Sequence, residues 1–378
     1  MVNEKANKHT FWITILIVVF IVAGVGGYFL GVNQVQSRYK REQELNVILN
    51  RSDMEGMGEI NGTIYVSGHK NPDSDTVGSS IGYAALLRSL GYDAQAVVFG
   101  PVNNETKFIL QEAGLETPPL LEDASGCNMV LMDHGDYEQS ADGMKDAFIV
   151  SIIDHHSDGT VSTGNMLVYD ARPLGSTATI VWIRYRNYGI TPEKAVAHVM
   201  LGSVLSDTCN LKTQTTTNAD REAVKALSEI AGVTDVDAFY QGMYKALLSH
   251  EGMTDEEIFF SDYKEYKAGN FNYSIGCIDV YEEQEANELA GKMKALMPET
   301  LKSTGMDMTF TQIVILREDK SITYLIPSDE TAAEVLEQAY GDVATFDGTS
   351  YILSPGISRK KDLVPAITNI LESYYTGH

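Results

Sequence analysis

The chain has 378 residues, 44% of them hydrophobic and 21% charged, so it is long enough for two domains with packed cores and is not a disordered chain. Its formal net charge of −24 at pH 7 argues against a protein that binds a nucleic-acid polymer, because such binding needs clustered Lys and Arg. A phosphate substrate would have to meet a local group of positive residues or bound cations.

The N-terminal region contains a long stretch without charge, FWITILIVVFIVAGVGGYFLGV at residues 11–32. As a helix it is long enough to cross a hydrocarbon core of about 30 Å. We predict an uncleaved transmembrane anchor, because the stretch exceeds the roughly 7–15 apolar residues of a secretory signal peptide. The segment 33–51 lacks Pro and Gly, and we expect it to continue as a helical stalk.

The charges that flank this stretch bear on its orientation. Lys5 and Lys8 precede it, and Arg38, Lys40 and Arg41 follow it. Because positive residues favour the cytoplasmic side, the slight excess after the stretch favours cytoplasmic catalytic domains. The two counts are close, so the orientation stays open.

From Thr63 onward, short apolar runs alternate with longer segments of helical character. The runs are TIYVSG, DAQAVVF, MVLM and FIVSII, which predicts an α/β domain with a mainly parallel sheet flanked by helices. NYSIGCIDV, TFTQIVILR and SITYLIP, with helix-like segments at 283–296 and 331–339, predict a smaller C-terminal α/β domain. We expect the tail, anchor and stalk at 1–57, the first domain at 58–248, a linker at 249–261 and the second domain at 262–378.

Acidic residues and histidines follow three of the apolar runs directly. His69 comes after TIYVSG, Asp133 after MVLM, and Asp154 with two histidines after FIVSII. Ligands of open α/β sheets bind outside the carboxyl ends of the strands, so we expect these residues to meet. Their composition is that of a site for two divalent metals that activate a water and bind a phosphate, which indicates a metal-dependent phosphoanhydride or phosphoester hydrolase.

Each cluster also has a simpler interpretation when taken alone. Asp75 could cap a helix, and Asp133 could cap the element that follows it. Against this, one compact loop presents His69, Asp73 and Asp75 together, and two ions about 3.5–4 Å apart need a bridging carboxylate, which Asp133 is placed to supply. Asp207 ends a helix-like stretch, where a nearby cation explains a negative charge better than capping does.

The three cysteines, Cys127, Cys209 and Cys277, are far apart and form no CxxC pair. We interpret them as small buried side chains. They do not settle the cellular compartment.

Seven motifs in order carry a family resemblance: GHKNPDSD, LMDHGD, IIDHH, LGSTATI, SDT with the threonines after it, DYKEY and PGISRKK. From Ile64 to the C-terminus the chain resembles the DHH phosphoesterases, in particular the manganese-dependent family II inorganic pyrophosphatases with a second, DHHA2 domain. The resemblance implies an active site in a cleft between the two domains. It also implies hydrolysis of pyrophosphate, or of another small phosphoanhydride, by a metal-activated water.

The resemblance implies a role for each matching position. Asp133 would bridge two metals, and Asp154 would orient the site from behind the ligands. The metal ligands would be His69, Asp73, Asp75, Asp133, His155 and Asp207, and the catalytic groups that bind substrate phosphates would be His156, Lys264, Arg359 and Lys360. Mixed His and carboxylate ligands suit Mn²⁺, with Co²⁺ or Mg²⁺ as alternatives and a further Mg²⁺ accompanying the substrate.

Three departures from the family pattern leave the substrate open. Gly135 stands where the pyrophosphatases usually have Asn, LKTQTTT replaces a Lys-Ser-Pro-Thr pattern, and YSIGCIDV replaces Gln-Val-Asn-Thr-Val-Asp. An exopolyphosphatase or nucleotide phosphodiesterase of the same superfamily is one alternative. A membrane-tethered phosphate sensor with little turnover is another, and a homodimer through exposed strands of the first domain is left open.

Overall fold

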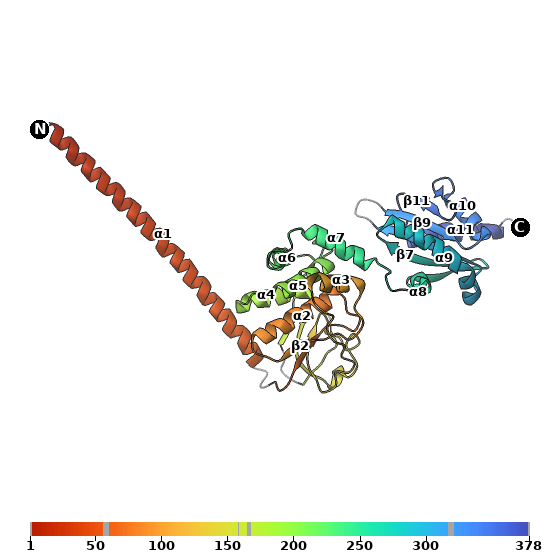
Figure 1. Cartoon of the computed structure of the whole chain (residues 1–378), viewed down its shortest axis with the longest axis horizontal. Helices are drawn as coiled ribbons and strands as arrows, with labels where there is room; N and C mark the ends of the chain where they lie inside the picture. Colours follow the sequence, from red (N-terminus) through yellow and green to blue (C-terminus); the bar gives the residue numbers. More distant parts are fainter. Residues whose placement is uncertain (1, 56–59, 158, 165–167, 317–320, 377–378) are drawn as a thin grey trace. The chain divides into compact units, whose positions relative to one another are not determined.

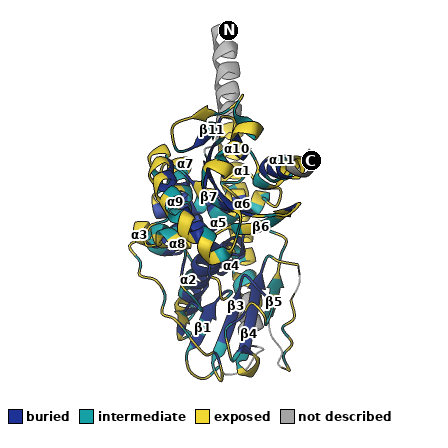
Figure 2. Ribbon diagram, turned by 90° about the vertical axis from the view of Figure 1, so that its right-hand side faces the viewer, coloured by how far each residue is buried: buried dark blue, intermediate teal, exposed yellow. Residues whose placement is uncertain are grey.

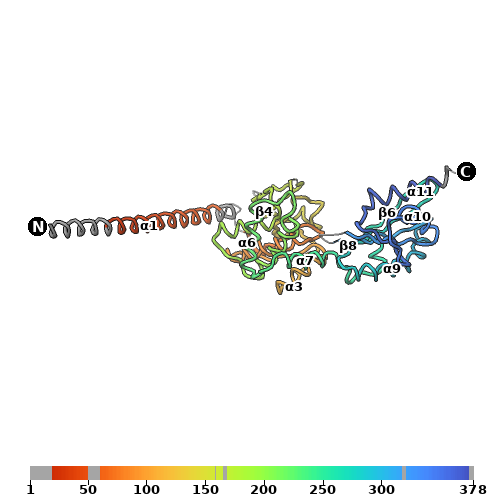
Figure 3. Tube along the Cα trace, turned by 90° about the horizontal axis from the view of Figure 1, so that it is seen from above, coloured from red at the N-terminus to blue at the C-terminus, as the bar shows by residue number. Residues whose placement is uncertain are grey.

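The structure is a computed structural model that describes residues 2–55, 60–157, 159–164, 168–316 and 321–376; the side chains of 2–18, 50–55 and 374–376 lie outside the description. The chain divides into two compact units, Met1–Tyr240 and Gln241–His378 (Figure 1). Helix α7 (Val236–Leu247) leads from the first unit into the second (Figure 3).

The chain begins with one long helix, α1 (Val2–Glu55). Over Val19–Leu49 this helix is long and apolar enough, by length and composition, to cross a membrane, and none of that stretch is buried in the structure. Phe20 and Leu30, for example, are 75% and 71% exposed. Residues 11–18 of the expected anchor lie in the helix, but their side chains fall outside the described residues.

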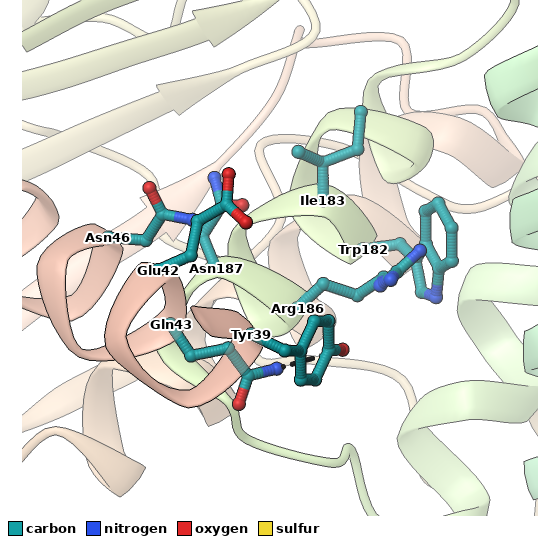
Figure 4. A pocket seen from close by; sticks show the side chains of 8 residues that line it. All are labelled: Tyr39, Glu42, Gln43, Asn46, Trp182, Ile183, Arg186 and Asn187. Atoms are coloured by element: carbon teal, nitrogen blue, oxygen red, sulfur yellow. Dashed lines mark hydrogen bonds between the residues drawn. The ribbon is translucent and has the colours of Figure 1, made fainter. Parts of the chain in front are cut away.

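The C-terminal part of α1 packs on α4 (Thr177–Tyr188). Figure 4 shows side chains from both helices around a cavity of about 180 Å³. Gln43 donates a hydrogen bond to the Tyr39 hydroxyl at 3.1 Å, and the Arg186 guanidinium lies 5.2 Å from the centre of the Trp182 ring. The stalk is therefore in contact with the first domain.

The first unit is built on a five-stranded parallel sheet of order β2-β1-β3-β4-β5. Its strands are β1 (Ile64–Ser67), β2 (Ala94–Ala96), β3 (Asn128–Met132), β4 (Phe148–Asp154) and β5 (Val168–Ala171). The inner strands β1, β3 and β4 are largely buried (Figure 2). Their apolar runs are continuous because helices cover parallel sheets, so the predicted α/β class is confirmed.

The remaining helices of this unit are α2 (Ser74–Ser89), α3 (Asn104–Ala113), α5 (Lys194–Asp207) and α6 (Asn218–Ala231), with a 3₁₀ turn at Met144–Asp146. Helices α2 and α5 approach closely at Gly78, where a Cβ atom would lie 2.8 Å from the carbonyl oxygen of Val199. A larger residue at Gly78 would force the helices apart. This close packing brings the start of α2 near the end of α5.

The second unit contains a six-stranded mixed sheet of order β10-β11-β9-β8-β7-β6, in which only the pair β7 and β8 is parallel. The strands are β6 (Tyr263–Ala268), β7 (Phe271–Val280), β8 (Met308–Leu316), β9 (Ser321–Pro327), β10 (Thr345–Phe346) and β11 (Tyr351–Leu353). The helices are α8 (Asp255–Phe260), α9 (Glu283–Thr304), α10 (Glu330–Tyr340), a π-helical turn Arg359–Leu363 and α11 (Val364–Thr376). The expected C-terminal α/β fold is confirmed.

Candidate metal centre

The carboxyl ends of β1, β3 and β4 meet at one edge of the parallel sheet, and the predicted ligands gather there. Three groups of donor atoms each have their members within 4.8 Å of one another. Two of them, the ligand groups, contain all six predicted ligands: His69, Asp73 and Asp133 form one, and Asp75, Asp133, His155 and Asp207 form the other. The third consists of Asp133, His155 and His156, so Asp133 belongs to all three.

Asp133 lies at the centre of the site and is almost fully buried. The Nε2 atom of His69 is 3.5 Å from its Oδ2, and the Nε2 atom of His155 is 3.3 Å from its Oδ1. Thr76 and Thr177 each donate a hydroxyl hydrogen bond to it, at 3.0 Å. Its φ of 62° is uncommon for a residue other than glycine, so the surrounding contacts hold the backbone in a strained conformation.

Asp75 is held by the N-terminus of α4. Its carboxylate accepts hydrogen bonds from the Ser176 hydroxyl at 2.7 Å, the Thr177 amide at 2.6 Å and the Ala178 amide at 3.0 Å. The first amides of a helix have no partner within the helix and favour an anion. Helix α4 therefore fixes one ligand with its backbone and a second, Asp133, with the hydroxyl of Thr177.

The two ligand histidines and the carboxylates perturb each other's protonation. Burial disfavours the charged form of His69, but Asp133 and Asp73 outweigh it and raise its pKa to about 10. For His155, Asp133 and Asp75 likewise outweigh burial and raise the pKa to about 9. In the absence of a cation, protonated imidazoles would balance part of the negative charge.

Asp75 and Asp207 lie among other negative charges that are only partly balanced by positive groups. Burial, followed by the charge of Asp133, raises the pKa of Asp75 to about 7. Burial and the charges of Asp75 and Asp133 also raise the pKa of Asp207. A bound divalent cation would relieve this repulsion, and a set of imidazole and carboxylate donors fits Mn²⁺.

A backbone carbonyl group fixes the orientation of the His155 imidazole. Its Nδ1 lies 3.0 Å from the carbonyl oxygen of Leu174. A hydrogen donated from Nδ1 to that carbonyl leaves the Nε2 lone pair directed at the carboxylates, as metal-binding histidines require. The predicted ligand role of His155 thus has a suitable tautomer available.

His156 and Asp154 form a pair beside the ligands. The Nδ1 of His156 lies 2.9 Å from Oδ1 of Asp154, and this hydrogen bond raises the pKa of His156. Asp154 is completely buried, and its Oδ2 has no hydrogen-bond partner among the described residues. Asp154 orients His156, whose side chain is 54% exposed and free to meet a ligand.

The predicted phosphate-binding cations Lys264, Arg359 and Lys360 all lie in the second unit. Arg359 donates to the Asp262 carbonyl oxygen at 2.7 Å and to both Asp262 carboxylate oxygens at 2.8 Å. This contact holds the Arg359 segment against the start of β6, the strand that carries Lys264. The side chains of Lys264 and Lys360 are exposed.

Several supporting residues were not predicted from the sequence. Thr76, Ser176 and Thr177 hold ligands, and the buried Asp220 holds the turn before α4 by accepting from the Gly175 amide at 3.0 Å and the Thr179 hydroxyl at 2.6 Å. The LGSTATI motif was the available signal for Ser176 and Thr177. Asp220 also completes a capping box with Thr217 at the start of α6, which a Thr-x-x-Asp pattern could have indicated.

The side chain of Tyr169 lies next to Gly135, one of the positions where the sequence departs from the pattern of the resemblance. A Cβ atom at this position would lie 3.0 Å from the Tyr169 hydroxyl and 3.9 Å from the unpartnered Oδ2 of Asp154. Tyr169 thus occupies the space next to the glycine. The asparagine that the resemblance implies at this position could enter only if Tyr169 moved.

Comparison with known proteins agrees with this architecture. Residues 63–204 match the model of the DHH family, N-terminal domain, and residues 241–370 match the model of the DHHA2 domain. A protein of Exiguobacterium sp. described as "Probable manganese-dependent inorganic pyrophosphatase" is 35% identical over 310 residues, which cover 81% of this chain and 98% of the relative. A Clostridium acetobutylicum protein with the same description is 33% identical over 82% of this chain and 98% of its own length.

A solved structure gives the same result. The crystal structure of a Methanococcus jannaschii protein assigned to the family II inorganic pyrophosphatases is 31% identical, covers 83% of this chain and all of its own, and has a TM-score of 0.50. The matches cover nearly the whole length of these relatives, and this chain has the ordered metal-ligand motifs at one edge of its sheet. The chain belongs to the family of manganese-dependent inorganic pyrophosphatases that combine a DHH domain with a DHHA2 domain.

Proposed function

We propose that the protein hydrolyses inorganic pyrophosphate to two phosphate ions with the help of two divalent metals, Mn²⁺ being preferred. The observation that carries this proposal is the pair of ligand groups that share the buried Asp133. A carboxylate common to both groups is what two neighbouring cations require to offset their mutual repulsion. The names of the relatives support pyrophosphate as the substrate.

The six donors have distinct tasks in this proposal. His69 and Asp73 would hold one metal, Asp75, His155 and Asp207 would hold the other, and Asp133 would contribute to both. When bound, the two cations would lower the pKa of a water and offset charge on the phosphate oxygens. The hydroxyls of Thr76 and Thr177 keep Asp133 in the orientation that serves both metals.

Positive side chains bind and orient the substrate. His156, held by Asp154, is the cationic group next to the ligands, and its raised pKa favours the protonated form that binds an anion. We propose that Lys264, Arg359 and Lys360 of the DHHA2 domain supply further cations that bind the substrate phosphates. The planar guanidinium of Arg359 suits two phosphate oxygens at once.

We also propose that α1 anchors the protein in a membrane, with the catalytic domains on the cytoplasmic side. The exposed apolar side chains over Val19–Leu49 support an anchor, and Arg38, Lys40 and Arg41 support this orientation. We further propose that two copies can pair through an exposed edge strand of the first domain. Protease accessibility of inverted membrane vesicles and sedimentation of the purified protein test these two points.

The substrate is tested with the full-length chain in detergent, loaded with Mn²⁺ and offered pyrophosphate, tripolyphosphate and a linear dinucleotide in parallel. We expect rapid phosphate release from pyrophosphate, much slower phosphate release from tripolyphosphate, and little cleavage of the dinucleotide to mononucleotides, which is followed by chromatography. Preference for tripolyphosphate or the dinucleotide would assign the chain to a different substrate within the superfamily. Absence of cleavage of all three would overturn the proposed enzyme and favour a phosphate sensor.

The variant Asp73→Ala separates the enzyme from the sensor. In an enzyme this change removes one metal ligand and should abolish nearly all turnover, whereas a sensor has no turnover to lose. Asp93→Ala is a suitable control, because the Asp93 carboxylate lies in the same unit, outside the ligand groups, and accepts a hydrogen bond from the Thr63 hydroxyl. We expect Asp93→Ala to keep full activity.

A further inference from the structure

A buried carboxylate outside the ligand groups connects two segments of the metal centre. Glu105 lies in the first turn of α3 and is only 4% exposed. Its Oε2 accepts hydrogen bonds from the Ser74 hydroxyl and from the Ser206 hydroxyl, both at 2.7 Å. One oxygen atom therefore joins the start of α2 to the end of α5.

The two serines are neighbours of the ligands in sequence. Ser74 lies between Asp73 and Asp75, and Ser206 immediately precedes Asp207. The ligand group that contains Asp207 draws on both segments, since Asp75 lies at the start of α2 and Asp207 at the end of α5. The other ligand group draws on only one of them, through Asp73. The connection thus bears most directly on the group that contains Asp207.

The local structure explains why a carboxylate can be buried here. The Asn103 side chain caps α3 by accepting from the Thr106 amide at 2.8 Å, and the N-terminal end of a helix favours a negative charge. The two serine hydroxyls offset part of the cost of burial. Two further contacts lie beside Glu105: the Ser203 hydroxyl donates to the Ser74 carbonyl oxygen at 2.8 Å, and the Ser74 and Thr106 hydroxyls lie 3.1 Å apart.

We propose that Glu105 is a positioning residue that sets the spacing between the α2 ligands and Asp207, and thereby the affinity of the second metal. This inference rests on the metal centre of the proposed function and not on its substrate. Without Glu105, the buried Ser74 hydroxyl and the half-buried Ser206 hydroxyl would lose the acceptor that they share, and the end of α5 could move relative to the start of α2. Loss of such an outer hydrogen bond typically lowers metal affinity about 10–100-fold.

The test is a titration of the metal-free full-length chain in detergent with Mn²⁺, followed by calorimetry and by electron paramagnetic resonance of the bound ion. We compare wild type, Glu105→Ala and Glu105→Gln. We expect Glu105→Ala to weaken one of two Mn²⁺ sites about 10–100-fold. Glu105→Gln keeps one carbonyl oxygen that can accept both hydroxyls, so it should stay within about threefold of wild type.

A matched control separates positioning from general loss of stability. Ile149→Val removes one buried methylene from the core of the same unit, away from the ligands, and should lower the melting temperature without changing Mn²⁺ affinity. Unchanged affinity in Glu105→Ala would overturn the proposal, as would an equal loss in Ile149→Val. Should Glu105→Ala fail to fold, Ser74→Ala and Ser206→Ala each remove one hydrogen bond to Glu105, and the proposal then requires both to weaken the same site.

This outcome is independent of the enzyme assay. A wild-type chain that binds two Mn²⁺ ions but releases no phosphate would contradict the proposed function and leave the role of Glu105 intact. A wild-type chain that hydrolyses pyrophosphate, with equal Mn²⁺ affinity in Glu105→Ala, would contradict only the role of Glu105.

Discussion

The metal centre of the first domain and the cationic segment of the second are built in opposite ways. The predicted ligands around Asp133 are buried or half-buried. Asp133 itself is contacted from four elements, by hydroxyls of α2 and α4 and by imidazoles that follow β1 and β4. Arg359 is held by one residue, Asp262, while Lys264 and Lys360 are exposed.

The difference determines how each region responds to change. The charges of the metal centre balance one another, so removal of one carboxylate alters the protonation and position of all its neighbours. In the cationic segment each side chain acts through its own contacts. We therefore expect large, cooperative effects in the first region and smaller, separable effects in the second.

The largest effect is expected for Asp133→Asn. Asparagine tolerates a positive φ, so the backbone can be kept while the charge common to both ligand groups is lost. We expect both Mn²⁺ sites to weaken and kcat to fall more than about 100-fold, beyond the effect typical of outer hydrogen bonds. Calorimetric titration and phosphate release measure the two quantities.

A control for this variant is Asp146→Asn. Asp146 is an exposed carboxylate in the 3₁₀ turn of the same unit and should be silent in both assays. A loss of only one Mn²⁺ site in Asp133→Asn would contradict the bridging role.

In the cationic segment, Arg359→Lys is expected to raise KM about 10–100-fold with a smaller change in kcat. Lysine has a point charge and cannot reproduce the paired donors of the guanidinium toward Asp262 or phosphate. Steady-state kinetics with pyrophosphate provide the measurement. Asp262→Asn leaves the backbone acceptor in place and should raise KM less.

The neighbouring Lys361 provides the matched control for Arg359. It is exposed, and Lys361→Ala removes one positive charge from the same turn. Lys361→Ala should leave KM nearly unchanged, and an equal rise of KM there would show that Arg359 has no special role within this turn.

A further prediction concerns the stability of the metal-free chain as a function of pH. The pKa values of His69 and His155 are raised to about 10 and about 9, so their stabilising contribution is complete below the usual histidine pKa and is lost as the pH rises through 9–10. The raised pKa of Asp75, about 7, acts in the same direction at lower pH. We expect the melting temperature in excess chelator to fall between about pH 7 and pH 10.

Excess Mn²⁺ should reverse this trend. Metal binding requires deprotonated ligands, so affinity and the stabilisation that it gives increase with pH. A melting temperature that falls equally with pH in chelator and in Mn²⁺ would contradict the assignment of His69 and His155 as ligands.

The sequence predicted which donor residues gather at one edge of the sheet, because these residues follow continuous apolar runs. His69, Asp133 and His155 come directly after buried parallel strands, and parallel strands bring their carboxyl ends to one edge. The contact between Asp262 and Arg359 joins residues 97 positions apart across the mixed sheet, and no periodic pattern encodes it. The sequence analysis also missed Glu105, because a glutamate in the first turn of a helix is ordinarily exposed.

The smallest effect is expected at Gly135, where the chain departs from its family. Gly135→Asn would bring its Cβ within 3.0 Å of the Tyr169 hydroxyl, but Tyr169 is 51% exposed and can move outward. We expect a loss of roughly 1 kcal/mol in the free energy of unfolding. In a Tyr169→Ala background the loss should vanish, because the asparagine side chain gains room and its amide can donate to Oδ2 of Asp154, which now lacks a partner.

Urea unfolding of the two single variants and the double variant gives the coupling between these positions. A cost of Gly135→Asn that is the same in both backgrounds would show that Tyr169 is not what replaces the family's asparagine. Coupling of the expected sign would mean that glycine and tyrosine together substitute for that residue beside Asp154. The departure would then be a local exchange of packing next to His156 that leaves all six metal ligands unchanged.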